Sequence, residues 1–201
     1  MARPLSWLNP GLCVGAAIPP LMLWWRAALG QLGANPVERA LNNLGYLTLV
    51  LLLLTLACTP LQRLFLWSWP ARVRRTLGVL SFVYASLHLL VYVAIDHTFD
   101  FGEILEEVVK RPFIAVGAAT WLALVPLTIT STNASVRRLG FNRWKRLHRM
   151  SYLCAALGVL HFYMRVKKDV SQPVLMGAIL AALLLVRLLP QRKPARAPGA
   201  S

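Results

Sequence analysis

Acidic residues are scarce in this chain. Its 201 residues include only 7 Asp and Glu against 22 Lys and Arg, and charged residues of both signs make up 14% of the total. Hydrophobic residues make up 57%, which is more than a soluble domain of this size can enclose in its core. The composition therefore predicts an integral membrane protein.

Several motifs of soluble proteins are also missing. The chain has no glycine-rich nucleotide-binding fingerprint, so any flavin or nicotinamide reductase that serves it must be a separate chain. Its three cysteines, Cys13, Cys58 and Cys154, stand singly in apolar segments and are interpreted as small core residues. The basic residues lie between long apolar runs, which is typical of membrane orientation signals, so no nucleic-acid partner is expected.

Six apolar segments approach the roughly 20 residues that a helix needs to cross a bilayer. The last two are short, but flanking arginines can reach the headgroups and extend them. The sequence thus predicts an all-α membrane protein, a six-helix transmembrane bundle in which residues 1–189 form a single domain and 190–201 a disordered cytoplasmic tail. The six segments are 4–25, 40–62, 76–95, 112–136, 150–164 and 170–186.

The charges between these segments predict the orientation. If the N-terminus is cytoplasmic, 15 of the 22 basic residues fall on the cytoplasmic side, and all seven acidic residues fall on the opposite side. Loops rich in Lys and Arg stay in the cytoplasm. We therefore expect both termini inside, in a multi-pass protein of a bacterial inner membrane surrounded by lipid.

Two histidines are expected at similar depths in the membrane. His88 lies twelve residues into the third segment and His161 fourteen residues into the fifth, which places them about 18 and 21 Å from the cytoplasmic ends of two parallel helices. Ionisable groups at membrane depth are costly and usually functional. A pair at one level can bind a heme iron from both faces, although a single histidine can also be a structural hydrogen-bonding group.

The other two histidines are placed differently. His148 precedes His161 by thirteen residues, so it is expected about 20 Å nearer the cytoplasm and on another helix face. It is interpreted as the sole protein ligand of an inner heme, a partner of a heme propionate or flavin, or a surface histidine. The basic stretch 137–149 around it is interpreted either as a membrane anchor or as a binding site for the phosphate of a flavin or for heme propionates. His97 is expected to face solvent.

Short motifs in a fixed order resemble the ferric reductase-like transmembrane family, and within it the heme-binding membrane subunits of periplasmic methionine sulfoxide reductase systems. The resemblance covers nearly the whole chain. The motifs are Gly33-Ala34-Asn35-Pro36, Thr59-Pro60-Leu61, Arg74-Arg75-Thr76-Leu77-Gly78 with Leu87-His88, Arg111-Pro112-Phe113, Thr130-Ser131-Thr132, Trp144 to His148 with Ser151-Tyr152, and His161-Phe162.

The resemblance implies a heme b protein, with FMN as a further cofactor, that takes electrons from the quinone pool or a flavin reductase. It implies delivery to a periplasmic molybdopterin subunit, MsrP, on which methionine sulfoxide in oxidised proteins is reduced. The residues that match the heme-associated positions are His88, His148 and His161. The chain is accordingly expected to be an electron-transfer subunit and to leave substrate reduction to its partner.

Two other functions are compatible with these features. One is a stand-alone ferric reductase or an oxidase-like cytochrome b, which the absence of flavin and nicotinamide domains disfavours. The other is a membrane transporter or scaffold with structural histidines. A heme absorption spectrum would distinguish the transporter from both redox functions.

Overall fold

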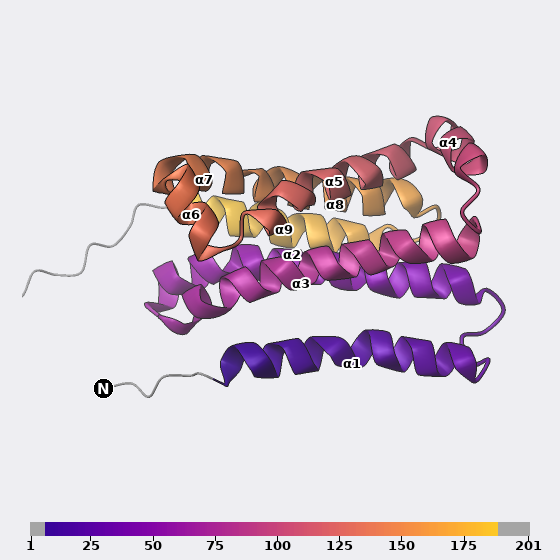
Figure 1. The fold of residues 1–201 in the computed structure, drawn as a ribbon, viewed down its shortest axis with the longest axis horizontal. Helices are drawn as coiled ribbons and strands as arrows, with labels where there is room; N and C mark the ends of the chain where they lie inside the picture. The colour runs from indigo at the N-terminus through magenta and orange to yellow at the C-terminus, as the bar shows by residue number, and fades with distance from the viewer. Residues whose placement is uncertain (1–6, 189–201) are drawn as a thin grey trace, which may run out of the picture.

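The computed structural model describes residues 7–188, and all regular elements in this part of the chain are helical (Figure 1). The expected tail, 190–201, lies outside the described residues, as does the start of the first expected segment. The elements are α1 (Leu8–Ala28), α2 (Pro36–Phe65), α3 (Trp69–Leu90), the π-helical η1 (Val91–Asp96), α4 (Phe101–Lys110), α5 (Pro112–Ile129), α6 (Asn133–Leu139), α7 (Phe141–His148), α8 (Met150–Arg165) and α9 (Ser171–Leu188).

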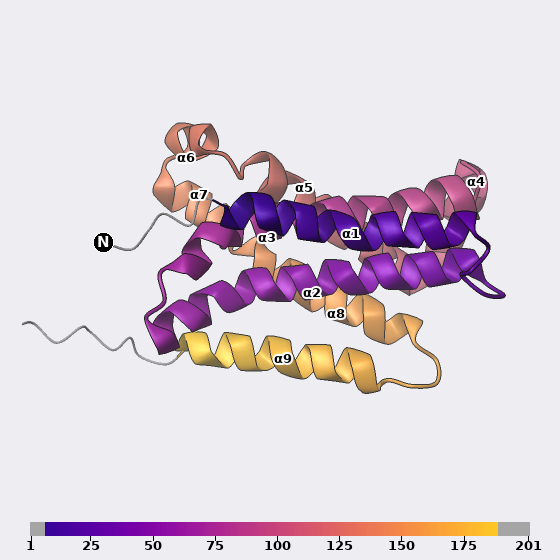
Figure 2. The ribbon, with the colours of Figure 1, turned by 90° about the horizontal axis from the view of Figure 1, so that it is seen from below.

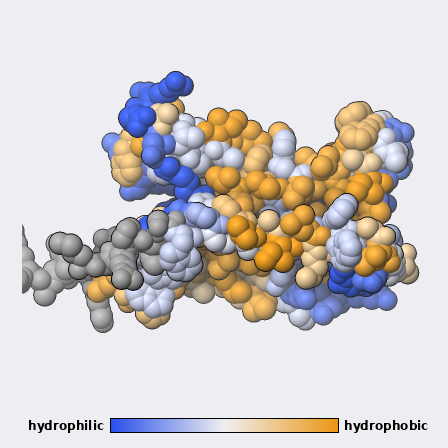
Figure 3. All heavy atoms as spheres, turned by 60° about the horizontal axis from the view of Figure 1, so that its bottom comes forward, coloured by the Kyte–Doolittle hydropathy of each residue, from blue (hydrophilic) through white to orange (hydrophobic). Residues whose placement is uncertain are grey.

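Four of these elements are long and apolar enough to cross a membrane: α2, the continuous α3–η1, α5 and α9. The 21-residue α1 and the 16-residue α8 run alongside them. Hydrophobic residues occupy the middle of the visible face, and hydrophilic residues gather toward its two ends (Figure 3). An all-helical, multi-pass membrane protein is therefore confirmed, whereas crossing by all six expected segments stays a prediction.

The bundle has two ends of opposite character. The α1–α2 loop, α4 and the α8–α9 loop meet at one end, and these regions with their helix termini contain all seven acidic residues. The α2–α3 loop, α6 and α7 meet at the other end, which contains no acidic residue. We call these the acidic end and the basic end.

The core lies where α2, α5, α8 and α9 pack together. The closest helix pairs are α2 with α3 and α5 with α8, and α2 lies between α1 and α9 (Figure 2). Leucine side chains interlock around small residues of α8, which allow the helices to approach closely. The fully or nearly fully buried members of this core include Leu52, Leu56, Leu124, Cys154, Ala155 and Leu180.

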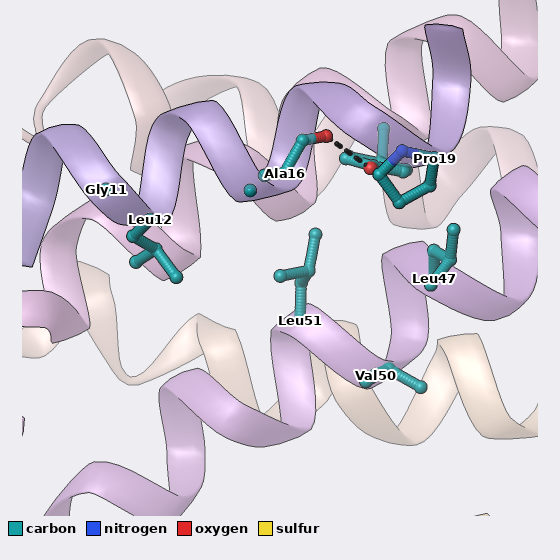
Figure 4. Close-up of a pocket in the computed structure, with 9 residues that line it drawn as sticks. Gly11, Leu12, Ala16, Pro19, Leu47, Val50 and Leu51 are labelled. Carbon is teal, nitrogen blue, oxygen red and sulfur yellow. Dashed lines mark hydrogen bonds between the residues drawn. The ribbon is translucent and has the colours of Figure 1, made fainter. Parts of the chain in front are cut away.

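A hydrogen bond attaches α1 to the edge of the bundle. Pro20 has no backbone N–H, so the carbonyl of Ala16, one turn earlier, lacks its helical donor. The Tyr84 hydroxyl of α3 donates to this carbonyl at 2.5 Å (Figure 4). Beside this bond, α1 and α2 are separated by a shallow apolar groove, which small residues of α1 and leucines of α2 line. Tyr84 therefore ties α1 to α3, as does the Thr76 hydroxyl, which donates to the Asn9 side chain at 3.1 Å.

The expectation that the fourth apolar segment is helical to Val136 is wrong. Helix α5 ends at Ile129, because the hydroxyls of Thr130 and Ser131 bond back to backbone carbonyls within its last turn and compete with helix continuation. The Thr132 hydroxyl then caps α6 by accepting from the Ser135 N–H at 3.1 Å. The chain turns again at Gly140, whose φ of 75° favours glycine, and enters α7.

We predict that Tyr84→Phe loosens α1, because it leaves the Ala16 carbonyl without a donor in an apolar setting. The free energy of unfolding in detergent should fall by about 1 kcal/mol, and α1 should become more accessible to protease. Tyr163→Phe, which alters an exposed tyrosine of α8, is the control and should leave both measurements unchanged.

Candidate functional site

A large cavity lies between the spans in the half of the bundle nearest the acidic end. It has a volume of about 980 Å³ and is lined mainly by α2, α3, α5 and α8, with η1 and α4 at its outer side. This volume is at the upper end of the range for cofactor and ligand sites in proteins. Two of the four histidines line it, His88 and His161.

The imidazole of His88 is fixed by the backbone of the neighbouring helix. Its Nδ1 lies 2.9 Å from the carbonyl oxygen of Leu41 on α2. A carbonyl only accepts, so Nδ1 carries the hydrogen and donates it. The lone pair therefore lies on Nε2, which is the nitrogen that this arrangement leaves for a metal.

His161 is held in the same way by a different helix pair. Its Nδ1 donates to the carbonyl oxygen of Phe113 on α5 at 2.7 Å, so its Nε2 also carries a lone pair. The Phe113 ring lies 5.9 Å from the imidazole, centroid to centroid. Both histidines are thus set in one tautomer before any ligand binds.

A glycine stands against each imidazole. A Cβ at Gly45 would lie 3.2 Å from the His88 ring, and one at Gly117 would lie 2.8 Å from the His161 ring. Each glycine is one helical turn after the carbonyl that binds the corresponding histidine. The local arrangement therefore occurs twice, once in the α2–α3 pair and once in the α5–α8 pair.

Neither glycine was expected from the sequence to be functional. Gly45 precedes His88 by 43 residues and Gly117 precedes His161 by 44. This parallel spacing, together with a glycine inside an otherwise bulky apolar span, is the signal that could have revealed them.

The structure brings the two imidazoles into one site. Their ring centroids are 6.2 Å apart and their planes are almost perpendicular, at 89°. Two imidazole nitrogens bound to one metal, each about 2 Å from it, place the ring centroids roughly 6 Å apart. The spacing, the free Nε2 atoms and the glycine-lined walls all fit a heme iron held from both faces.

Two ion pairs lie at the outer rim of this cavity. Arg165 donates to Glu38 at 3.0 Å, and the Nε of Arg111 lies 3.1 Å from a Glu107 carboxylate oxygen. All four residues line the cavity. From the sequence, Arg111 was expected only in a family motif and Arg165 only as an arginine that flanks a short span. The guanidinium groups of both are suited to the carboxylates of a porphyrin.

His148 does not join this site. It ends α7, whereas His161 lies in α8, so the expectation that one continuous helix carries both is wrong. Its Nε2 is 3.0 Å from the Thr130 hydroxyl, and its ring stacks on Trp144 with centroids 4.2 Å apart. Burial lowers the pKa of His148, and nearby Arg74 and Arg75 lower it further, which favours the neutral ring.

The expectation that His97 faces solvent is also wrong. His97 is only 8% exposed, and it lies against the Tyr92 ring, 4.5 Å between centroids, with Nδ1 3.2 Å from a Glu103 carboxylate oxygen. The wider turn of η1 and the left-handed backbone of Thr98 and Phe99 fold the chain back over it. It does not line the cavity.

Comparison with known proteins decides the family. Residues 44–159 match the model of the ferric reductase like transmembrane component. The chain is 49% identical over 199 residues to the protein-methionine-sulfoxide reductase heme-binding subunit MsrQ of Deinococcus radiodurans, covering 98% of this chain and 96% of that protein. The chain belongs to the MsrQ family.

Other MsrQ proteins are similarly close. The chain is 48% identical to that of Herminiimonas arsenicoxydans, with 92% of this chain and 85% of the relative covered. It is 47% identical to that of Rhodospirillum rubrum, with 92% and 90% covered. No solved structure matches the chain. The ferric reductase match includes the segments that carry Gly45, His88 and Gly117 but ends two residues before His161.

We predict that Gly117→Ala destabilises the protein, because the new methyl group meets the His161 ring rather than a flexible side-chain end. Overpacking of this kind costs about 1–3 kcal/mol in unfolding free energy, measurable by thermal or denaturant unfolding in detergent. Gly15→Ala is the matched control, since a Cβ there meets nothing within 4 Å. An equal effect of both substitutions would contradict the proposed close contact.

Proposed function

We propose that this protein is a heme b electron-transfer subunit of a protein-methionine-sulfoxide reductase. The observation that carries the proposal is the pair of imidazoles 6.2 Å apart in a cavity of about 980 Å³, each held by a backbone carbonyl through Nδ1. The MsrQ relatives are named as heme-binding subunits, which supports the same cofactor here.

In this proposal His88 and His161 would hold the heme iron. A bound heme supplies one-electron transfer. The protein's residues orient the imidazoles, and Gly45 and Gly117 leave room for them. Arg165 and Arg111, at the rim of the cavity, would hold the heme carboxylates.

We further propose a six-span topology with both termini in the cytoplasm of a bacterial inner membrane. The basic end would then face the cytoplasm and the acidic end the periplasm, in agreement with the tendency of Lys and Arg to stay inside. The histidine-lined cavity lies near the acidic end. A heme there is suited to deliver electrons to a periplasmic partner across a short gap.

The partner proposed on that side is a molybdopterin subunit, MsrP, on which methionine sulfoxide is reduced. Electrons would enter at the basic end from the quinone pool or a flavin reductase, with FMN as a second cofactor of the chain. His148, stacked on Trp144 at this end, is the residue we propose for electron entry or for an inner cofactor.

The ligand assignment predicts that His88→Ala and His161→Ala each abolish the heme of this cavity. The measurement is the heme-to-protein ratio of the purified protein, from its reducible Soret band. His97→Gln is the control, since His97 is a buried histidine outside the cavity. Full heme content in either alanine variant would refute the pairing, and a wild-type protein without any Soret band would favour the transporter hypothesis.

For His148 we predict a partial effect. His148→Ala should retain the heme held by His88 and His161, because His148 does not line that cavity. It should reduce the content of a second heme or FMN, or slow electron transfer from quinol to MsrP. Unchanged cofactor content together with an unchanged transfer rate would make His148 a structural residue only.

A further inference from the structure

Few basic side chains of this protein are shielded from solvent. Among residues 7–188, only Arg63, Arg74, Arg165 and Arg187 are not exposed. Arg165 is paired with Glu38 at the acidic end. The other three lie at the basic end, where the chain has no acidic side chain at all. Shielded cations with no counterion within residues 7–188 favour an anion from the surroundings.

These three arginines meet on one face of α2. Arg187 of α9 donates from Nη2 to the carbonyl oxygen of Leu56 at 2.6 Å, and Arg74 of α3 donates to the Thr59 hydroxyl at 3.3 Å. Arg63 of α2 donates from Nη1 to the carbonyl oxygen of Arg187 at 2.7 Å. Positions 56, 59 and 63 share a face because they are three and four residues apart. Guanidinium groups from three helices thus gather within two turns of α2.

Neutral groups hold Arg187 in place without neutralising it. Pro60 cannot donate to the Leu56 carbonyl, so this acceptor is free for Arg187. Arg187 also donates to the Tyr152 hydroxyl and lies 4.8 Å from the centre of that ring. Its Nε is buried and has no hydrogen-bond partner among the described residues. The side chain is therefore fixed in orientation while its charge stays uncompensated.

We propose that Arg63, Arg74 and Arg187 bind the phosphate group of an anionic phospholipid. Guanidinium groups are suited to phosphate because their N–H donors match its oxygens in pairs. The site lies at the ends of α2 and α9, two helices able to span the membrane, and therefore at headgroup level. Leu64, Phe65 and Leu188 beside it are more than half exposed and can contact acyl chains. Basic pockets between transmembrane helices bind lipid headgroups in this way.

The same phosphate chemistry is available from a soluble ester, so the test must separate the two sources. Full-length protein is placed in nanodiscs of phosphatidylcholine, with or without phosphatidylglycerol of the same acyl chains, and the thermal midpoint is measured. A third sample holds phosphatidylcholine nanodiscs with millimolar inorganic phosphate. Native mass spectrometry counts bound phosphatidylglycerol, and the Soret band reports heme content.

Phosphatidylglycerol should raise the midpoint of the wild-type protein by about 2–4 °C for each guanidinium engaged. In Arg63→Gln, phosphatidylglycerol should raise the midpoint by about 2–4 °C less than in the wild-type protein. This variant should also retain less bound phosphatidylglycerol, while its heme content is unchanged. Arg187→Gln should show the same smaller midpoint rise and weaker lipid binding. If Arg187→Gln does not fold, the Arg63→Gln result by itself tests the proposal. Arg72→Gln is the matched control, because Arg72 is exposed, lies at the same end and makes no hydrogen bond within residues 7–188.

Three results would overturn the proposal. The first is that phosphatidylglycerol does not raise the midpoint of the wild-type protein, or that Arg72→Gln reduces this rise as much as Arg63→Gln does. The second is an equal shift with inorganic phosphate, which would assign the site to a soluble phosphate ester. The third is loss of heme from Arg63→Gln, which would make a heme carboxylate the anion.

Discussion

Polar groups within a bilayer must find their partners inside the protein, and in this protein the two cavity histidines find theirs in the backbone of a neighbouring helix. His88 binds the Leu41 carbonyl and His161 the Phe113 carbonyl. Each bond fixes the register of a helix pair and at the same time determines which ring nitrogen stays free. Helix packing and metal-binding chemistry are therefore consequences of one interaction, made twice.

Proline extends the same constraint to the edges of the bundle. Pro20 and Pro60 each remove a helical donor, and the carbonyl freed in each case accepts from a side chain of another helix, Tyr84 in one and Arg187 in the other. These bonds help to attach α1 and α9, together with the Thr76–Asn9 bond to α1 and the bonds that Arg187 makes with Arg63 and Tyr152. An irregularity in one helix thus supplies the attachment point for another.

The sequence predicted the features that follow from helix geometry. A constant rise per residue places His88 and His161 at one level. The apolar runs mark where α2, α3, α5 and α9 lie, although the α3 run begins seven residues late and the α5 run ends seven residues late. It could not predict Gly45 and Gly117, because their role depends on which helices become neighbours. It also failed at His97, whose burial results from the left-handed turn at Thr98 and Phe99, a conformation that neither residue type favours.

The short helices escaped prediction for a different reason. Helices α4 and α7 each carry a charged face, so neither has the composition of a membrane span. They are also only 10 and 8 residues long, too short to show a clear helical periodicity in the sequence. Only the caps, Asp100 for α4 and Gly140 for α7, mark where they begin. The break at Arg149 separates His148 from His161, so counting residues along one helix could not give the position of His148.

The distribution of charge makes the two ends of the molecule depend on different surroundings. At the acidic end, Glu38 and Glu107 pair with Arg165 and Arg111 around the cavity, so the electrostatics there are set by the protein itself. At the basic end no carboxylate side chain exists to pair with Arg187. Within residues 7–188 Arg187 has no counterion, so the stability of that end should depend on the composition of the membrane more than the stability of the histidine site does.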